Sequence, residues 1–411
     1  MPGRHAYLVP SAGVVPAASP GLDCRVRILM MNYEFPPLGA GGSTSSFNLA
    51  RNVVALGHDV DMITMGFRGV PNEELMDGIR VFRVPSIRAR REVCHTHEMA
   101  TYVLSGTAKA ASLASKYDYD LCNAHFIFPT GPIAYATRRL RGLPYVLTAR
   151  GSDVPGHNPN RFRFDHQLLR PIWRGLVRDA DAVVAVSRHL AERIEAHAPG
   201  VKVETIPNGC SPLGAADDNV QPLDSVIRNG RIRVLMVTRL HEFKGVQYML
   251  EAASRMSLDL EVNIVGDGPY RSTLEAQAAR IGKPVRFWGW LDRNSPEMWR
   301  LYRESSVFVF PSEREGSPTV VQEAMSAGLA VVAADAAGTP EVVGDAGILV
   351  SPKDPAGIAD ALVRLANDPA LVRTLGERAR ERIRTEFDWK MLAQRYVDLY
   401  ARVVARRSDG R

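Results

Sequence analysis

Two segments of the chain resemble each other, and each opens a series of alternating strand-like and helix-like patterns. Residues 25–32 (RVRILMMN) and 231–238 (RIRVLMVT) both place a short apolar run behind alternating arginines. A glycine-containing loop and a helical pattern follow each run. The repeat predicts two α/β domains of similar fold, each beginning with one of these segments as its first strand.

Further short apolar runs follow in both halves, and helical patterns separate most of them. Strand–helix alternation of this kind gives parallel sheets with helices on both faces. The predicted fold class is therefore α/β, with two Rossmann-like doubly wound domains facing each other across a cleft, where ligands of open α/β sheets bind. The later strands are predicted at residues 59–64, 79–84, 121–124, 145–148, 182–186, 260–265, 285–288, 307–310, 330–334 and 347–350.

The chain divides into five predicted parts. Residues 1–24 lack a long apolar core and are predicted to form a flexible extension rather than a signal peptide. Residues 25–205 and 231–388 are the two domains. Residues 206–230, rich in Asp, Asn, Gly and Pro toward their end, are the linker. Residues 389–411 contain a terminal amphipathic helix.

The composition narrows the class of protein. Hydrophobic residues make up 45% and charged residues 23% of the 411, as in an ordinary soluble protein. The net charge of +6 is too small to indicate nucleic-acid binding. The four cysteines are scattered without a CxxC pair, which disfavours disulfides and a zinc site. No apolar run approaches about 20 residues, so we expect a cytoplasmic protein, with attachment to a membrane surface left open.

Two glutamates flank the start of one predicted helix. Ser317 is the expected N-cap, Pro318 fits the first turn and Gly328 the end of this helix. Glu315 then lies in the loop before the helix, and Glu323 lies about a turn and a half inside it. Because a helix N-terminus attracts anions, carboxylates on each side of it indicate a ligand with both phosphates and hydroxyls.

Two cations follow the first strand of the second domain. Arg239 stands at its carboxyl end and Lys244 five residues later, so both can converge on one diphosphate. A solvated charged loop explains the same residues equally well.

Glycine-rich loops end strands in both domains. Gly39, Gly41 and Gly42 allow close approach of the backbone to a phosphate or sugar, although their spacing is not the dinucleotide fingerprint. Gly266 ends a strand of the second domain in a similar loop. Each loop is weak evidence when taken alone.

Polar residues also end two neighbouring strands of the first domain. His125 follows one strand, and Arg150 and Asp153 follow the next. We expect His125 to point into the cleft, although a buried structural histidine is the simpler explanation when it is considered alone. The aspartate pairs 59/61, 118/120 and 179/181 flank or precede strands, so we interpret them as structural and expect no divalent metal site.

Together these motifs resemble those of the family 4 retaining glycosyltransferases, which have the GT-B fold. The resemblance extends from about residue 25 to about residue 406. Its most specific parts are residues 315–328 (EGSPTVVQEAMSAG) and 238–245 (TRLHEFKG). Residues 39–42, 208–209, 265–269 and 311–312 support it.

The resemblance implies transfer of a sugar from a UDP- or GDP-linked donor to a hydroxyl acceptor. The first domain would bind the acceptor and the second the donor, and the terminal helix would return to the first domain. Catalytic roles would fall to Arg239 and Lys244 at the diphosphate, Glu315 facing the sugar and His125 near it. Donor binding would fall to Glu323 at the ribose and to Gly41, Gly42, Gly266, Gly316, Ser317, Pro318 and Thr319. Arg150 and Asp153 would lie on the acceptor side.

Two positions depart from the commonest family pattern. Ser317 stands where many members have Phe, and Arg150 stands where many have His, so the donor and the acceptor stay open. In this family cations and a helix dipole stabilise the leaving group, so neither a cofactor nor a metal is expected. Front-face attack, in which the leaving phosphate takes the acceptor proton, is the working mechanism, with a carboxylate nucleophile as the general alternative.

Three other functions fit two α/β domains. The spacing of Glu315 and Glu323 argues against a nucleotide-sugar epimerase, and the missing fingerprint argues against a dinucleotide oxidoreductase. A non-catalytic nucleotide-sugar-binding subunit is the third. Residues 86–92 (SIRARRE) form a basic run in the first domain. They are either a solvated helix start or a contact to a membrane surface or an anionic lipid-linked acceptor. The expected acceptors are sugars, glycolipids and other hydroxyl compounds.

Overall fold

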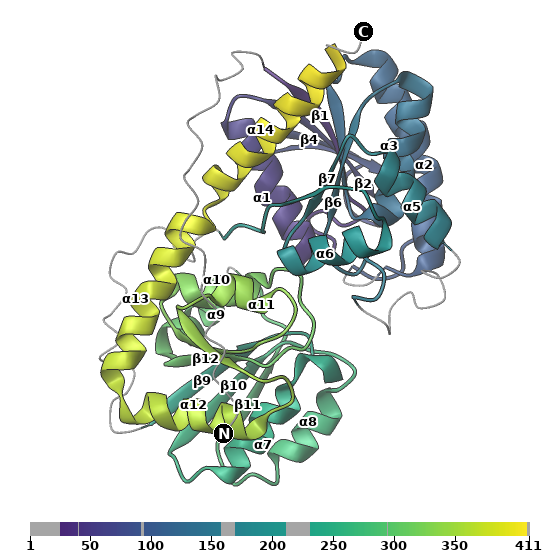
Figure 1. Ribbon diagram of the computed structural model, residues 1–411. Helices are drawn as coiled ribbons and strands as arrows, with labels where there is room; N and C mark the ends of the chain where they lie inside the picture. Colours follow the sequence, from purple (N-terminus) through teal and green to yellow (C-terminus); the bar gives the residue numbers. More distant parts are fainter. Residues whose placement is uncertain are drawn as a thin grey trace.

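The chain folds into two α/β domains with one helix shared between them (Figure 1). The computed structural model describes residues 25–39, 41–91, 94–157, 169–210, 231–293 and 295–408. The predicted extension, residues 1–24, lies outside the described residues, as does most of the predicted linker. No helix in the described ranges is both long and apolar enough to cross a bilayer.

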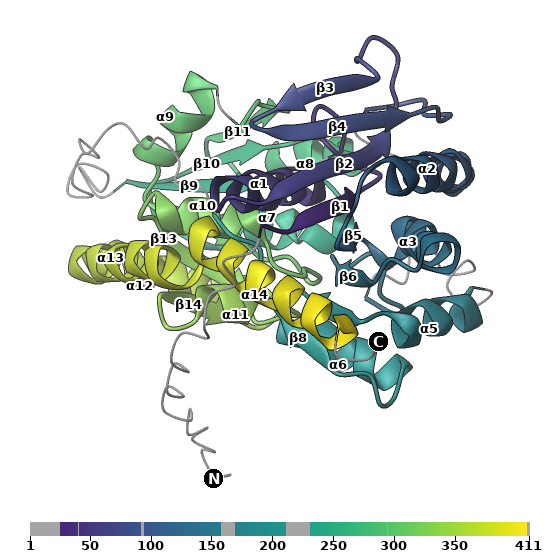
Figure 2. The ribbon, with the colours of Figure 1, turned by 90° about the horizontal axis from the view of Figure 1, so that it is seen from above.

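The first domain contains an eight-stranded sheet in the order β3-β4-β2-β1-β5-β6-β7-β8. Its strands are β1 Arg27–Met31, β2 Asp59–Met65, β3 Glu73–Met76, β4 Ile79–Val84, β5 Leu121–His125, β6 Tyr145–Ala149, β7 Ala182–Ala185 and β8 Val203–Thr205. Helices α2 Thr96–Lys116, α3 Ile127–Arg141, α5 Arg170–Asp179 and α6 Arg188–His197 pack on one face. The first three of these lie in a row in Figure 2. Helix α1 (Gly41–Ala55) packs on the other face.

The second domain contains a six-stranded parallel sheet in the order β11-β10-β9-β12-β13-β14. Its strands are β9 Ile232–Val237, β10 Leu260–Val265, β11 Val285–Gly289, β12 Val307–Phe310, β13 Ala330–Ala334 and β14 Gly347–Val350. Helices α7 Val246–Arg255, α8 Arg271–Ala278 and α12 Pro355–Asn367 cover one face. Helices α9 Pro296–Glu304, α10 Thr319–Ser326, α11 Thr339–Val343 and α13 Pro369–Glu386 cover the other. The predicted fold class is confirmed.

Helix α14 (Trp389–Ser408) leaves the second domain after α13 and packs on the first (Figure 1). Its side chains Leu392, Tyr396 and Tyr400 are buried with those of β1 and α1. Burial of each large apolar side chain contributes roughly 1.5–3 kcal/mol, so this contact holds the two domains together. The Tyr400 hydroxyl also accepts a hydrogen bond from Asn123 Nδ2 in β5.

The structure differs from the predictions in three local features. Strand β3, which the pattern did not indicate, pairs antiparallel with β4 at the edge of the first sheet, and β8 is a further short edge strand. The prediction that Ser317 caps the helix is wrong. Helix α10 begins at Thr319 with Pro318 at the N-cap, and no side chain caps it.

Candidate active site

A glycine brings the two key loops of the second domain together. After β9 the chain makes a short 3-10 turn, Glu242–Lys244, and Gly245 follows it with φ +76°. A Cβ at Gly245 would lie 2.2 Å from the carbonyl oxygen of Pro311, so only glycine permits this approach to the loop after β12. The approach places Lys244 beside Glu315.

Lys244 and Glu315 form an ion pair at this contact. The ammonium Nζ binds Glu315 Oε1, and the Ser312 hydroxyl donates to the same oxygen at 2.9 Å. The side chains of Lys244 and Glu315 are only 12% and 16% exposed. The pair is thus partly shielded from water, which strengthens its attraction relative to an exposed pair. A diphosphate that recruits Lys244 has to compete with Glu315 for the ammonium.

Arg239 lies two residues beyond the end of β9 and is exposed. Its side chain makes no ion pair or hydrogen bond to another described residue, so the guanidinium is available to an anion. Gly266 lies nearby with φ +129°, and a Cβ there would meet the Thr238 carbonyl oxygen at 1.8 Å. The close packing of two strand ends is therefore one reason for glycine at this position, and its contact with a donor stays a prediction.

Two helix N-termini face each other across the domain boundary. Gly41 begins α1, and a Cβ added to it would lie 3.7 Å from Thr319 Oγ1 at the start of α10. Gly42 packs against the Phe126 ring, which a Cβ would approach to 2.7 Å. Unpaired N–H groups and partial positive charge at both helix starts make this boundary attractive to an anion.

The backbone of the predicted donor loop is held from the first domain. A Cβ at Gly316 would lie 3.1 Å from the carbonyl oxygen of Arg150. The Ser317 carbonyl accepts a hydrogen bond of 3.1 Å from Asn208 Nδ2. Gln322 Nε2 in turn donates to the Asn208 carbonyl at 2.7 Å. These contacts fix the loop after Glu315 against the neighbouring domain.

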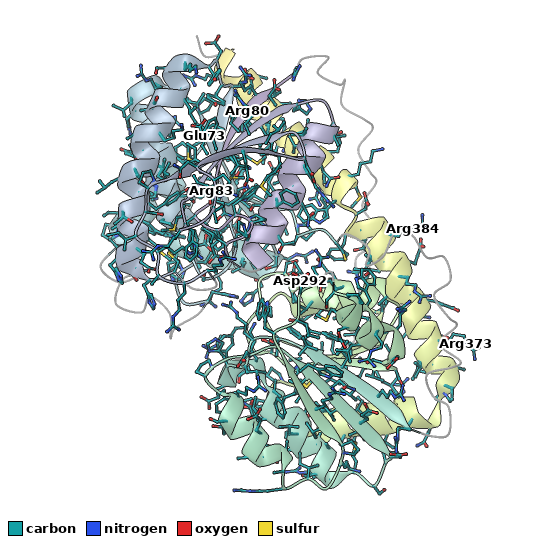
Figure 3. The ribbon with its side chains drawn as sticks, turned by 180° about the vertical axis from the view of Figure 1, so that it is seen from behind. Glu73, Arg80, Arg83, Asp292, Arg373 and Arg384 are labelled. Carbon is teal, nitrogen blue, oxygen red and sulfur yellow. The ribbon has the colours of Figure 1, made fainter. Side chains whose placement is uncertain are left out.

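Glu323 is buried beneath the start of α10. Its Oε1 pairs with Arg293 Nε at 2.8 Å, and its Oε2 accepts a hydrogen bond of 3.2 Å from the Tyr302 hydroxyl. Burial raises the pKa of Glu323, against the opposing effect of the Arg293 guanidinium. Asp292, the residue before Arg293, is labelled in Figure 3 and lies at the boundary between the two domains.

A small cavity next to Glu323 lies between the two domains. Polar residues of α1 form one wall of this cavity, and the start of α10 forms the other. Its lining residues are Thr44, Ser45, Asn48, Gly209, Cys210, Arg293, Thr319 and Glu323.

His125 lies at the carboxyl end of β5 and is fully buried. Arg150 Nη2 lies 2.8 Å from its Nδ1, while its Nε2 makes no hydrogen bond to any residue in the described part of the chain. Burial, assisted by the charge of Arg150, lowers the pKa of His125 well below its ordinary value, so the ring is neutral. His125 is therefore placed at the expected strand end.

Asp153, predicted on the acceptor side, is turned into the protein. Its carboxylate accepts hydrogen bonds from the backbone N–H groups of Ile127 at 2.8 Å, Arg150 at 3.0 Å and Gly151 at 2.8 Å. Its side chain is 2% exposed, so it organises two loops of the first domain. The burial of Asp153 disfavours direct contact with an acceptor, and such contact stays a prediction.

At least one member of each aspartate pair has a structural partner. Asp61 binds Arg80 and the Tyr119 hydroxyl, Asp120 accepts the Arg27 backbone N–H, and Asp181 pairs with Arg138. All three stabilise the first domain from within.

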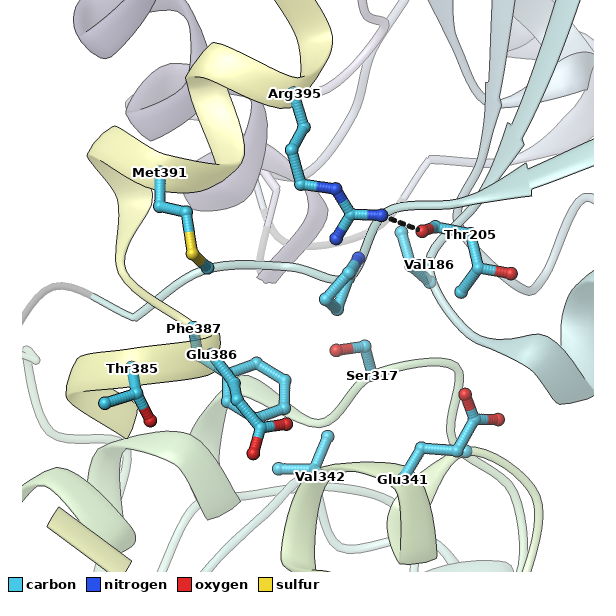
Figure 4. Close-up of a pocket in the computed structure, with 12 residues that line it drawn as sticks. Val186, Thr205, Ser317, Glu341, Val342, Thr385, Glu386, Phe387, Met391 and Arg395 are labelled. Carbon is cyan, nitrogen blue, oxygen red and sulfur yellow. Dashed lines mark hydrogen bonds between the residues drawn. The ribbon is translucent and has the colours of Figure 1, made fainter. Parts of the chain in front are cut away.

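A further cavity lies at the crossover to α14, apart from the Lys244–Glu315 pair. It has a volume of about 320 Å³, and Arg395 spans part of it to donate to the Thr205 carbonyl oxygen at 2.7 Å (Figure 4). Ser317 borders it from the donor loop. None of its lining residues carries a buried polar side-chain atom without a partner.

Sequence reasoning missed two residues that matter here. Asn208 belonged to a motif quoted for the family resemblance, but nothing in the sequence indicated that it would bridge Arg150 and Ser317. Arg293 is a single arginine in a loop, which gives no signal in one sequence. Its pairing with Glu323 depends on contacts distant in the chain.

Comparison with known proteins identifies the family. Residues 39–212 match the model described as glycosyltransferase family 4, and residues 231–368 match that described as glycosyl transferases group 1. The glycogen synthase of Mycobacterium tuberculosis is 26% identical over 400 residues, which cover 91% of this chain and 94% of that protein.

Two solved structures share the whole fold. Sucrose-phosphate synthase from Thermosynechococcus elongatus has a TM-score of 0.80 at 22% identity, covering 93% of this chain and all of that one. Anabaena HepE in complex with UDP-glucose has a TM-score of 0.70 at 18% identity, covering 92% of this chain and all of that one. The two family models together span most of the chain, and the chain belongs to the family 4 glycosyltransferases of the GT-B fold.

Proposed function

We propose that this glycosyltransferase moves a sugar from a nucleoside diphosphate sugar, UDP- or GDP-linked, to a hydroxyl acceptor, with retention and without a metal. One observation carries the proposal. The N-termini of α1 and α10 face each other across the domain boundary, and the loop that carries Lys244 meets the loop that leads into α10. Two helix N-termini and a lysine at one boundary provide the positive charge that suits a ligand with several negative charges.

The chemical problem is departure of a diphosphate from the sugar C1. Negative charge grows on the leaving oxygen as the C1–O bond breaks, and preorganised donors lower the barrier by stabilising that charge. Lys244, Arg239 and the two helix N-termini are the groups that would do so here. These cations and helix dipoles supply the positive charge that a divalent ion supplies in other sites, so the proposed reaction needs no metal.

We assign Glu315 and Glu323 to the two remaining parts of the donor, the sugar and the ribose. Glu315 is held by Lys244 and Ser312, and we assign it to the sugar hydroxyls. Glu323 is held by Arg293 and Tyr302, and we assign it to the ribose. Both carboxylates are oriented before the donor arrives, which lowers the ordering cost of binding.

Retention follows from attack on the face that the diphosphate leaves. The acceptor hydroxyl forms its bond to C1 as the C1–O bond to phosphate breaks, and the acceptor proton passes to the leaving phosphate oxygen.

The comparisons support the donor class. HepE, which shares the fold, has been solved with UDP-glucose bound, and the mycobacterial relative is a glycogen synthase. A nucleotide-linked sugar is the substrate class that the present site would also take. Polysaccharides, glycolipids and other hydroxyl compounds are the proposed acceptors.

The basic run in the first domain is our candidate for contact with an anionic acceptor or membrane surface. Its residues 86–91 form a loop, and Arg88 donates a hydrogen bond of 3.1 Å to the Tyr33 carbonyl oxygen. Arg90 and Arg91 are exposed. These two arginines supply the positive surface on which this part of the proposal rests.

A panel of UDP- and GDP-sugars tests the function. The protein should gain thermal stability with one donor and release its nucleoside diphosphate in EDTA. Proton NMR of the product should show the anomeric configuration of the donor. Conversion of the donor to an epimer without transfer would favour the epimerase, while binding without turnover of any donor would favour a non-catalytic subunit.

A further inference from the structure

The contact between Arg150 and His125 determines the state of the imidazole. Arg150 Nη2 lies 2.8 Å from His125 Nδ1. A guanidinium can only donate hydrogen bonds, so Nδ1 has to accept with its lone pair. A neutral imidazole that accepts through Nδ1 carries its proton on Nε2. His125 is therefore held as a hydrogen-bond donor at Nε2.

The other branch of Arg150 reaches the second domain through one side chain. Arg150 Nη1 donates to Asn208 Oδ1, and Asn208 Nδ2 donates to the Ser317 carbonyl oxygen at 3.1 Å. Because arginine cannot accept, this contact also fixes the orientation of the Asn208 amide. The chain His125–Arg150–Asn208–Ser317 thus links β5 with the loop that follows Glu315.

The Nε2–H group of His125 has no hydrogen-bond partner among the residues that the structure describes. The side chain is fully buried, and Nε2 makes no hydrogen bond to any described residue. An unsatisfied buried donor in a native structure needs an explanation, and a ligand that accepts its hydrogen bond is one. The register of β1 and β5 ends with Met31 opposite Ala124, and the next residues of the two strands are Asn32 and His125. Asn32 Nδ2 donates to the Gly42 carbonyl oxygen at the start of α1 at 3.4 Å. His125 therefore lies close to the start of α1.

We propose that Arg150 is a positioning residue, which holds His125 in the Nε2–H form so that it donates to a hydroxyl of the transferred sugar. The proposal rests on the proposed function for the identity of that sugar. It replaces the predicted role of Arg150 as an acceptor contact, because its two branches are already engaged with His125 and Asn208. Through Asn208, the same guanidinium keeps the donor loop in register with the histidine.

The tautomer is measured directly on the whole protein. Long-range proton–nitrogen NMR spectra of ¹⁵N-histidine-labelled protein should show one neutral ring with its proton on Nε2, assigned by its absence from His125→Gln. In Arg150→Met this ring should become a mixture of tautomers or take up a proton. An unchanged His125 pattern in Arg150→Met overturns the proposal, whether or not the protein turns over any donor.

Kinetics then test whether the tautomer matters for transfer. Arg150→Met should lower kcat by about tenfold or more, with little change in the binding of free nucleoside diphosphate, which has no sugar. In His125→Gln the amide N–H can still donate near the Nε2 position, so adding Arg150→Met should cost much less there than in wild type. An equal loss in both backgrounds overturns the coupling.

A control and a second variant complete the experiment. Arg395→Met removes an arginine from the same domain boundary without touching His125, and its kcat should stay near wild type. If Arg150→Met fails to fold, Arg150→Lys is measured in its place, because a single ammonium cannot bridge the imidazole and Asn208 as the planar fork does. If no donor is turned over, the proposed function fails, while the NMR result still decides the role of Arg150.

Discussion

The ammonium of Lys244 and the carboxylate of Glu315 form an ion pair, and the Ser312 hydroxyl donates a hydrogen bond to the same carboxylate. The pair joins the loop after β9 to the loop before α10. Since Lys244 is the proposed diphosphate ligand and Glu315 the proposed sugar ligand, the pair fixes two proposed donor contacts relative to each other. Donor binding would exchange this pair for a phosphate and a hydroxyl.

Arg239→Ala and Lys244→Ala should each reduce transfer strongly while the protein stays folded. Each variant removes a cation from the position where negative charge develops, and a rise of about 2–4 kcal/mol in the barrier is expected. Steady-state kinetics with the best donor measure this loss, and circular dichroism checks the fold. Arg255→Ala, on an exposed face of α7, is the matched control. Near-wild-type turnover in both site variants would exclude the diphosphate assignment.

Glu315 and Glu323 should have separable effects. Glu323→Ala should raise the donor KM and weaken binding of the free nucleoside diphosphate, because ribose binding is shared by ground and transition states. Glu315→Ala should mainly depress kcat, because the sugar is the part that gains charge. Calorimetry with the diphosphate alone separates the two. Equal weakening by both variants would mean that the roles are wrongly assigned.

Tyr400→Phe should destabilise the protein by about 1–3 kcal/mol. The substitution leaves Asn123 Nδ2 buried without its acceptor on α14, and an unsatisfied buried donor costs about this much. Urea denaturation compares the variant with Tyr135→Phe, which removes a partly exposed hydroxyl from α3. Equal stability of wild type and Tyr400→Phe would show that this bond does not help to hold α14 on the first domain.

Stability should fall as the pH drops from about 6.5 to about 4. Burial lowers the pKa of His157 to about 4, so in this range the unfolded chain binds a proton that the folded protein does not. The loss from this residue approaches about 3 kcal/mol at the acid end. His125 changes stability in the same direction, because burial also lowers its pKa.

His157→Gln should therefore flatten only part of the stability profile. Urea midpoints between pH 7 and pH 4 measure it, with His97→Gln on the exposed start of α2 as the control. If the stability of His157→Gln falls with pH as steeply as that of the wild type, His157 does not contribute to the loss of stability in acid.

The sequence predicted the apolar elements well because their signals are local. Runs such as Val307–Phe310 are buried on both faces of a parallel sheet, and they stand out as continuous apolar segments. Strand β3 was missed because its residues Glu73–Met76 lie at an edge and alternate between exposed and half-buried positions. Its pairing with β4 depends on a turn rather than on an apolar run.

The site residues could be predicted where they belong to a single sequence motif. They could not be predicted where residues distant in the sequence come into contact. Glu315 and Glu323 could be placed around a helix start from their spacing alone. Ser317 was expected to cap that helix, but Asn208 binds its carbonyl and Gln322 lies 3.4 Å from its hydroxyl. Asn208 comes from a distant segment of the chain, and this tertiary contact overrides the local capping preference. The same holds for Arg150, whose two partners come from different segments of the chain.

Release of nucleoside diphosphate from a panel of UDP- and GDP-sugars, with EDTA present, tests the central claim most directly. The account predicts that wild-type protein turns over at least one donor under these conditions and that Lys244→Ala loses most of this activity. Release that stops on removal of divalent ions, or that proceeds equally well without Lys244, would contradict a metal-independent site built on the cations and helix N-termini at the domain boundary.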